Sequence, residues 1–304
     1  MKSIYVLYYK VTVLLLSFLL IGYTIPVMAQ DEPAAESEEK TDEPKPVRNT
    51  FESIFLFDNQ TTLVPAKGTF EMDIQHRFGT VNNGYDDFYG LYAPSNIRIG
   101  FAYSPINKLY VGFGFAKINL TWDATAKYAI FQQMKSGGSP VSLTYYGNIA
   151  IDTRDSENFV NGTDRFSYFN QLIISRKITD AVSLQVSPSW SHFNAVEGYV
   201  NEAGEIEGKM KNDHIALAFG GRFRVSSQMA IIANYDQPIT KHTTNNPEPN
   251  ISFGIEISTS AHAFQVFAGN YYSIIPQLNN VLNQNDYRES QFLIGFNITR
   301  LWNF

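Results

Sequence analysis

Large apolar side chains occupy every second position through most of this chain, up to its final residue. Residues 69–78, TFEMDIQHRF, alternate an apolar set with a charged or polar set: Phe70, Met72, Ile74, His76 and Phe78 against Glu71, Asp73, Gln75 and Arg77. Because successive side chains of a strand point to opposite faces, the segment predicts a strand with one oily face and one charged face.

The same alternation recurs along the chain and ends in FLIGFNITRLWNF, residues 292–304. Other segments that carry it are NIRIGFAYS, LYVGFGFAK, TWDATAKYAI, VSLTYYGNIAID, AVSLQVSPSW, HIALAFGGRFR, MAIIANYD, NISFGIEIS and HAFQVFAGN. In RFSYFNQLIISR the orientation of the faces stays open, because Asn170 interrupts the apolar row. We predict an all-β chain of about twelve strands.

A soluble sandwich also alternates, with its apolar faces turned inward. A membrane barrel is favoured because the apolar rows match the roughly 9–11 residues of a tilted spanning strand. The links SPINK, QQMKSGGSP, KITDA, VSS and STSA are short, and long polar loops lie between them, except at residues 118–120. Outer-membrane barrels have short periplasmic turns and longer outer loops, and only closure satisfies every backbone group in lipid. We therefore predict a transmembrane, antiparallel, up-and-down barrel in the bacterial outer membrane.

The N-terminus is typical of an export signal. Lys2 and Lys10 form a short basic region before an apolar run, residues 11–23, and Ala29 stands at a cleavage position, so residues 1–30 are predicted to be removed. An uncleaved anchor is the alternative. Residues 31–50 form an acidic leader without apolar periodicity, which predicts disorder. Residues 51–304 form the barrel domain, and residues 51–68 are expected at its periplasmic mouth or partly inside the lumen, with Pro65 and Gly68 turning the chain into the first strand.

Composition excludes several classes of function. The net charge of −6 argues against binding to nucleic acid, and the chain has 0 Cys, which excludes disulfides and cysteine metal sites. We expect no catalytic centre, no cofactor and no metal site. The histidines that come closest to one another in this topology, His192 and His214, are predicted at the outer ends of consecutive strands, yet Ser191 and His192 point to opposite faces and form no nucleophile–base pair.

The alternation in the terminal strand predicts which of its side chains face lipid. Its expected lipid-facing side chains are Phe292, Ile294, Phe296, Ile298, Trp302 and Phe304, and its expected lumen-facing ones are Gln291, Asn297, Thr299 and Asn303. Trp302 and Phe304 would lie in the periplasmic aromatic girdle, with Arg300 reaching to the interface. A terminal aromatic on such a strand resembles the signal that outer-membrane barrels present to their insertion machinery, which we expect as a partner besides outer-membrane lipid.

The opposite faces carry charges that should line the lumen. The candidates are Glu71, Asp73, Arg77, Arg98, Asp123, Lys127, Asp152, Arg222, Arg224 and Glu256. Glu71, Asp73 and Arg98 come from neighbouring strands and are expected to pair. Two interpretations stay open: ion pairs that fill a plugged interior, or the constriction of a small-solute pore. Gly112, Gly114, Gly220 and Gly221 would free interior volume or permit curvature.

Several segments together are similar to a family of outer-membrane β-barrel proteins of unknown function from Gram-negative bacteria. They are RNTFESIFLFDNQTTLVPAKGTFEMDIQHRFG, NIRIGFAYSPINKLYVGFGFAK, FNQLIISRKITDAVSLQVSPSW, HIALAFGGRFRV, SAHAFQVFAGN and FLIGFNITR. The resemblance implies the barrel and its location, and it brings no ligand or catalytic residue. The leading functional hypothesis is a passive small-solute channel or transport-associated barrel. The alternative is a structural protein that recruits a periplasmic or surface partner through loops or leader, and a lipid-modifying enzyme comes third.

Overall fold

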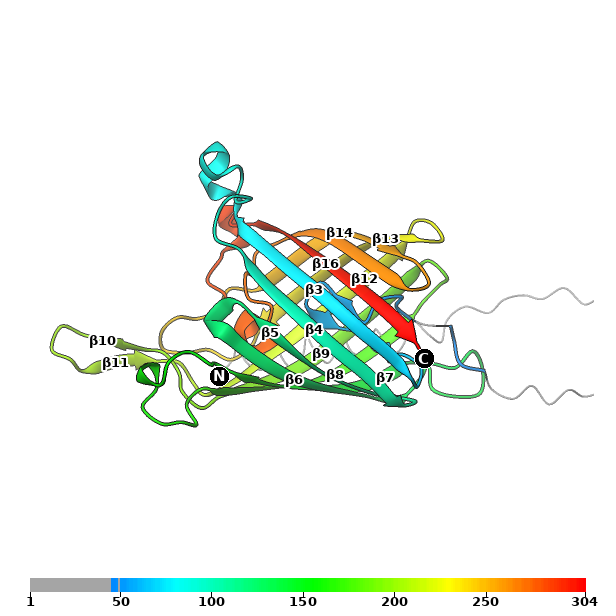
Figure 1. The fold of residues 1–304 in the computed structure, drawn as a ribbon, viewed down its shortest axis with the longest axis horizontal. Helices are drawn as coiled ribbons and strands as arrows, with labels where there is room; N and C mark the ends of the chain where they lie inside the picture. The colour runs from blue at the N-terminus through cyan, green and yellow to red at the C-terminus, as the bar shows by residue number, and fades with distance from the viewer. Residues whose placement is uncertain (1–44, 49) are drawn as a thin grey trace, which may run out of the picture. The chain divides into compact units, whose positions relative to one another are not determined.

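The computed structural model describes residues 45–48 and 50–304 (Figure 1). The predicted signal and the leader up to residue 44 lie outside the described residues and stay predictions. Within the described part, twelve antiparallel strands close into one barrel, which confirms the predicted fold class. The strands are β3 (Thr69–Thr80), β4 (Asn96–Ile106), β5 (Leu109–Ala116), β6 (Thr121–Phe131), β7 (Ser142–Ile151), β8 (Phe166–Lys177), β9 (Val182–Phe193), β12 (Asp213–Arg224), β13 (Met229–Pro238), β14 (Asn250–Ser258), β15 (His262–Gly269) and β16 (Leu293–Asn303).

Each barrel strand pairs with the next along the chain, and the last, β16, pairs with the first, β3. The register sets Asn303 opposite Thr69, so the C-terminus lies where the first strand begins. Gly68 is placed there with φ +86°, and a Cβ atom on it would come within 2.9 Å of the Phe304 carbonyl oxygen. A glycine is therefore needed where the chain enters the barrel.

The two faces of the wall are the reverse of those in a soluble sandwich. Phe113 and Ile231 on the outside are 51 % and 53 % exposed, whereas Arg77 and Lys127 on the inside are both 0 % exposed. The sandwich alternative is therefore wrong. In β8 the open question of facing is resolved, because Asn170 points outward beside the Tyr145 hydroxyl while the side chain of Phe169 packs inward.

The connections differ in length at the two ends of the barrel, as predicted. One end carries the short turns, and the other, here called the outer end, carries the long loops. The outer loops contain η1 (Val81–Asp87), η2 (Ile118–Leu120), η3 (Ser156–Asn158), the hairpin of β10 (Gly198–Val200) and β11 (Ile206–Lys209), α2 (Pro276–Leu282) and η4 (Tyr287–Glu289). No helix in the described residues is long and apolar enough to cross a membrane.

A short hairpin of β1 (Phe55–Leu56) and β2 (Asn59–Gln60) lies inside the barrel, and we call residues 51–64 the plug. The chain approaches at the short-turn end, where the Val47 amide donates to the Gln133 carbonyl. After the hairpin it leaves at that same end, where the Gly68 amide donates to the Ser104 carbonyl. The plug is therefore a re-entrant loop.

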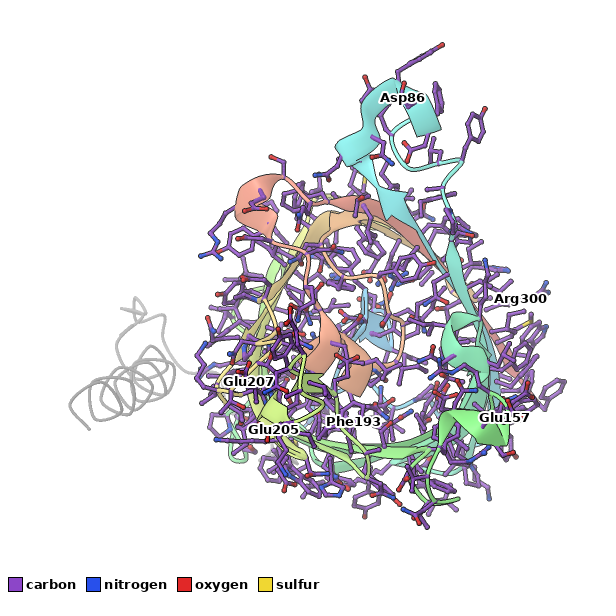
Figure 2. All side chains as sticks on the ribbon, turned by 90° about the vertical axis from the view of Figure 1, so that its left-hand side faces the viewer. Asp86, Glu157, Phe193, Glu205, Glu207 and Arg300 are labelled. Atoms are coloured by element: carbon purple, nitrogen blue, oxygen red, sulfur yellow. The ribbon has the colours of Figure 1, made fainter. Side chains whose placement is uncertain are left out.

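From the opposite end, the loop between β15 and β16 lowers α2 into the barrel. Figure 2 looks onto this outer end and shows α2 and the β1–β2 hairpin within the ring of strands. Gln277 on α2 donates to Asn148 on β7 over 3.0 Å, and Asn279 donates to Asp58 of the plug over 3.0 Å. The two inserted segments meet in the lumen.

Candidate functional site

The lumen side chains hold the plug mainly through its backbone. Lys127 Nζ donates to the carbonyl oxygens of Ile54 (3.1 Å) and Leu63 (3.2 Å), one on each arm of the plug. Asn297 Nδ2 donates to the Phe57 carbonyl over 2.7 Å. A buried backbone group needs a partner, and a two-residue ladder supplies few, so the wall supplies the rest.

Gln265 and residues on four other strands complete this cradle. Gln265 Nε2 donates to the Phe55 carbonyl (2.8 Å), and its Oε1 accepts from the Phe57 amide (3.1 Å). Further bonds join wall to plug: Asn59 to Asp236, Gln171 to Asn59, Gln185 to Gln60, Thr144 to Thr62 and Ser175 to Thr62. The alternation placed these wall residues on the inner face, but it gave no signal that they would bind a segment of the same chain.

Apolar contacts fix the tip of the plug. The Phe57 ring lies 4.3 Å from the Phe267 ring, between centroids, and the Arg77 guanidinium carbon lies 4.6 Å above Phe267. Leu56 packs over Gly220, where a Cβ atom would come within 2.8 Å of the Leu56 Cδ1 atom. Gly220 therefore frees interior volume for the plug, whereas its neighbour Gly221 belongs to the outward-facing set.

Arg98 sits between two carboxylates on the opposite part of the wall. Its Nη1 lies 3.1 Å from Asp73 Oδ1 and its Nε lies 2.8 Å from Asp123 Oδ2. Glu71, which we expected to share this pairing, accepts instead from the Tyr110 hydroxyl over 3.0 Å. Two carboxylates around one guanidinium compensate its charge where water is scarce.

The remaining candidate charges lie in three places. Arg222 Nε lies 2.8 Å from Glu256 Oε1, which closes a buried pair across β13. Arg224 follows at the short-turn end of β12 and forms no ion pair with a described residue. Asp152 lies just beyond the outer end of β7 and pairs with Arg154 there.

The plug and α2 leave little free space beside Arg98. The cavity there, bounded by Asp73, Asp123, Tyr146 and Asn148, measures about 20 Å³. That volume holds about one water molecule. The lumen charges are thus packed against inserted protein, and of the two interpretations this geometry fits the plugged interior.

A larger cavity of about 290 Å³ opens at the outer end, above α2, and we call it the vestibule. Its floor is formed by Leu278, Val281 and Leu282 of α2. Its walls and rim include Phe166, Phe193, Met210, Arg154 and Arg165. The sequence did not single out this site, because its parts come from five separate segments.

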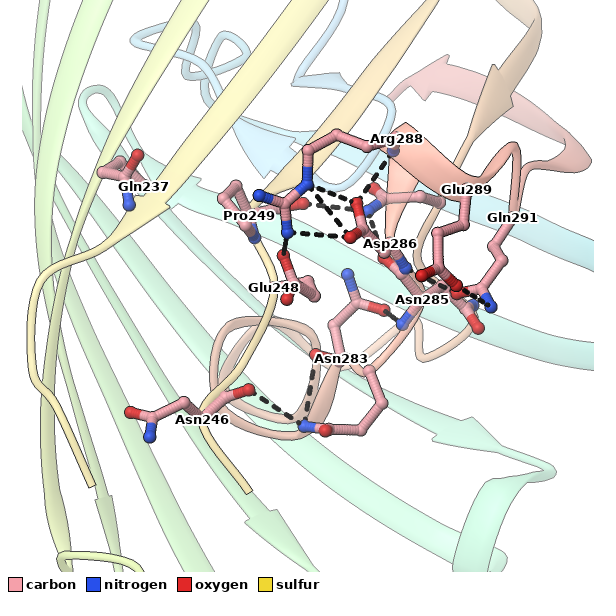
Figure 3. Close-up of polar contacts among 12 residues, drawn as sticks. Gln237, Asn246, Glu248, Pro249, Asn283, Asn285, Asp286, Arg288, Glu289 and Gln291 are labelled. Atoms are coloured by element: carbon pink, nitrogen blue, oxygen red, sulfur yellow. Dashed lines mark hydrogen bonds and ion pairs between the residues drawn. The ribbon is translucent and has the colours of Figure 1, made fainter. Parts of the chain in front are cut away.

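Ion pairs fasten the α2 loop to its neighbour (Figure 3). Arg288 Nη2 lies 3.0 Å from Glu248 Oε2 and 2.7 Å from Asp286 Oδ2. The hydrogen bond from Arg288 holds the pKa of Asp286 below its usual range. Gln284 donates to the Asn246 carbonyl in the same network. These contacts keep the loop, and with it α2, over the lumen.

The histidines do not assemble a catalytic group. His192 faces outward, with Nδ1 2.9 Å from Asp213 Oδ1, whereas His214 faces inward, with Nδ1 3.1 Å from His242 Nε2. No hydroxyl in the described residues hydrogen-bonds to either imidazole. In the same part of the chain, no cluster of three or more His, Asp or Glu could hold a metal ion.

The end of the chain lies at the short-turn rim. Trp302 packs on Phe70 with 5.6 Å between ring centroids, and Arg300 lies over the Trp302 ring at 4.7 Å. Phe304 is 91 % exposed. Recognition of Trp302 and Phe304 by insertion machinery stays a prediction.

The family model described as "Membrane bound beta barrel domain (DUF5777)" matches residues 51–302. The chain belongs to this family and lies in the bacterial outer membrane. No curated protein matches it.

Solved barrels resemble it in fold alone. The NanC porin shares 7 % identity at a TM-score of 0.47, with 77 % of this chain and 99 % of that chain covered. The COG4313 outer membrane channel from Pseudomonas putida F1 shares 12 % at 0.46, with 79 % and 97 % covered. The KdgM porin shares 10 % at 0.44, with 77 % and 99 % covered. Identities and TM-scores this low say nothing about what a protein transports.

Proposed function

We propose that this member of the membrane-bound β-barrel family is a small-solute channel that its own N-terminal plug keeps closed. One observation carries the proposal: the plug enters and leaves the lumen at the same end. A re-entrant loop can be withdrawn without threading a chain end through the barrel. The closed ladder of twelve strands does not depend on it.

The chemistry of the contacts also favours a removable plug. Most of them are hydrogen bonds between wall side chains and plug backbone, and several come from neutral amides such as Gln265 and Asn297. Exchanging such bonds for bonds to water changes the free energy by only about 0.5–1.5 kcal/mol each when water can enter. The wall itself cannot make that exchange in lipid.

An emptied lumen would suit small polar solutes. Its inner face carries both signs of charge, with Arg98 flanked by Asp73 and Asp123, and Arg222 beside Glu256. Compensated pairs of this kind create no strong field of one sign. We therefore expect weak ion selectivity.

The alternative, recruitment of a partner, rests on the loop that contains η1. Its Tyr85 and Tyr92 are 80 % and 81 % exposed, and the loop with Asp86 projects away from the barrel (Figures 1 and 2). Exposed aromatic side chains that lie together in this way are typical of surfaces that bind another molecule. A barrel that stays silent without its plug would favour this alternative.

The test uses the absence of native cysteine. Thr62 Oγ1 and Ser175 Oγ lie 2.6 Å apart, so Thr62→Cys with Ser175→Cys should form a disulfide from plug to wall. Ser142 is the register partner of Ser175 on the neighbouring strand, so Ser142→Cys with Ser175→Cys links wall to wall as a matched control.

Single-channel recordings in planar bilayers then separate the outcomes. A variant without residues 46–64 should give reproducible conductance steps. The plug-to-wall disulfide should abolish any openings of the intact chain until it is reduced, and the wall-to-wall disulfide should leave them unchanged. A folded, plug-free barrel with no conductance would refute the channel.

A further inference from the structure

The floor of the vestibule is apolar, and a charged rim surrounds it. Leu278 of α2 and Ile275, just before α2, pack against Ala116 and Ala150 of the wall, with Phe193 beside them. Above this cluster, Leu278, Val281, Leu282 and Met210 line the open cavity of about 290 Å³. Water finds few hydrogen-bond partners on such a surface, whereas an apolar group that binds there is removed from water. Figure 2 shows this end, with Phe193 labelled beside α2.

The charged side chains at the rim of the vestibule differ in whether they already have hydrogen-bond partners. Each of its three carboxylates already accepts a hydrogen bond from a protein donor: Asp152 from Arg154, Asp164 from Asn161, and Glu197 from Asn245. Added cations would compete with these donors. The carboxylates therefore do not point to a cationic ligand.

Arg165 differs from them. Its guanidinium carbon lies 4.7 Å from the Phe159 ring centroid, and its Nη1 makes one long bond of 3.4 Å to the Asp152 carbonyl. It forms no ion pair with a described residue. A guanidinium carries five N–H donors in a planar fork that fits a carboxylate. Arg165 thus offers a place for an anionic head group.

Beside the vestibule, the loop at the outer rim of the barrel is short. β5 and β6 are joined only through η2, with Asn119 and Thr121 lining the vestibule from within. On the membrane side of the same rim, Phe115, Leu120 and Trp122 line an apolar groove of about 210 Å³. A molecule with an apolar chain can rest in this groove and reach the vestibule over one short turn.

We propose that the vestibule binds a small anionic amphiphile, a carboxylate on a single apolar chain, that arrives from the outer leaflet. The carboxylate pairs with Arg165. The chain lies on Leu278, Val281 and Leu282. The cavity volume, at the lower end of the roughly 300–1,000 Å³ of ligand sites, limits the sheltered part of the chain to a short one.

The same helix that forms the floor contacts the plug. Leu278 and Val281 line the vestibule, and Asn279 between them donates to Asp58 of the plug over 3.0 Å. A ligand that shifts α2 would therefore disturb a plug contact. This coupling step rests on the proposed function, whereas the binding site does not.

The binding test uses decanoate as the probe, with the full chain in lipid nanodiscs and empty nanodiscs as the background. Arg165→Gln should weaken decanoate binding about tenfold, the effect of losing one charge-assisted bond near 1.4 kcal/mol. Arg154→Gln is the matched control, because Arg154 is already paired with Asp152, and it should change binding little. Decanol, which lacks the charge, should bind both variants as it binds the original chain.

A second variant blocks the space without removing a contact. Ala195 is an exposed loop residue that lines the vestibule, and Ala195→Trp should reduce binding of both decanoate and decanol. The variant with the disulfide between Cys substituted at positions 62 and 175 should still bind decanoate, weakened only by the coupling through α2, so this site can stand even if the plug does not gate a channel. Equal decanoate binding by Arg165→Gln and the original chain, or none above empty nanodiscs, would overturn the proposal.

Discussion

Lys127 is the lumen residue whose loss should loosen the plug most directly. Its side chain is fully buried, and its ammonium group bonds the Ile54 and Leu63 carbonyls, one on each arm of the hairpin. Lys127→Met keeps the length of the stem and removes every donor. Both carbonyls then face a thioether that cannot bond them.

The magnitude follows from these two bonds. Hydrogen bonds to a charged group contribute about 1.5–3 kcal/mol each, and relief of the buried ammonium offsets part of the loss. We expect docking of the plug to weaken by about 3 kcal/mol, which is roughly a hundredfold in the equilibrium between docked and released plug.

Exposure of the plug is measured by the rate at which a single introduced thiol reacts with a labelling reagent. Thr62 is 7 % exposed, and Thr62→Cys is the only cysteine in its variant because the chain has none. Adding Lys127→Met should raise its rate of reaction with a membrane-impermeant maleimide about a hundredfold. Lys117→Met is the matched control, because Lys117 Nζ also bonds one carbonyl, that of Ser95 (2.9 Å), but at the outer rim. If labelling in the Lys127 variant is as slow as in the control, the plug is not held by these bonds.

Two further predictions concern the plug and the α2 loop. Gly220→Leu should displace Leu56 and speed the same labelling of the Thr62→Cys thiol. Gly221→Leu should not, because Gly221 belongs to the outward-facing set and a Cβ atom there would meet only the Leu184 side chain, at 3.5 Å. Equal labelling rates in the two variants would contradict the packing of Leu56 over Gly220. Arg288 lowers the pKa of Asp286 from 3.8, so the stability that this pair gives the loop is present above that value and lost as pH falls through the lower, folded pKa. The protection of residues 284–290 against hydrogen exchange, taken relative to the intrinsic rate at each pH, should therefore fall as the pH drops below about 4, and Asp286→Asn should reduce this pH dependence.

The pairing of the lumen charges shows how far local pattern reaches. Alternation assigned Asp73, Arg98 and Asp123 to the inner face, because the period of a strand is two and a closed wall allows no other choice. It did not decide that Arg98 takes Asp73 and Asp123 while Glu71 turns to Tyr110. That choice depends on the register between strands and on the room that Gly100 and Gly114 leave around the guanidinium.

For the histidines too, the sequence predicted the position along the strand but not the side-chain partners. Sequence placed His192 and His214 at the outer ends of consecutive strands, and β9 and β12 do pair there. The register sets Asp213 opposite His192 and Ser191 opposite His214, so the two imidazoles lie on opposite faces. Proximity along two strands did not bring the side chains together.

The sequence by itself determined a barrel of about twelve strands and the side that meets lipid, because these follow from alternation over about ten neighbouring residues and from the lengths of the links between them. Only the tertiary structure decided that the lumen is filled. The plug has no periodicity of its own, and it is held by residues such as Asn297, 240 positions away from Phe57. Contacts over that distance depend on how the closed wall brings distant segments together, so no local pattern encodes them.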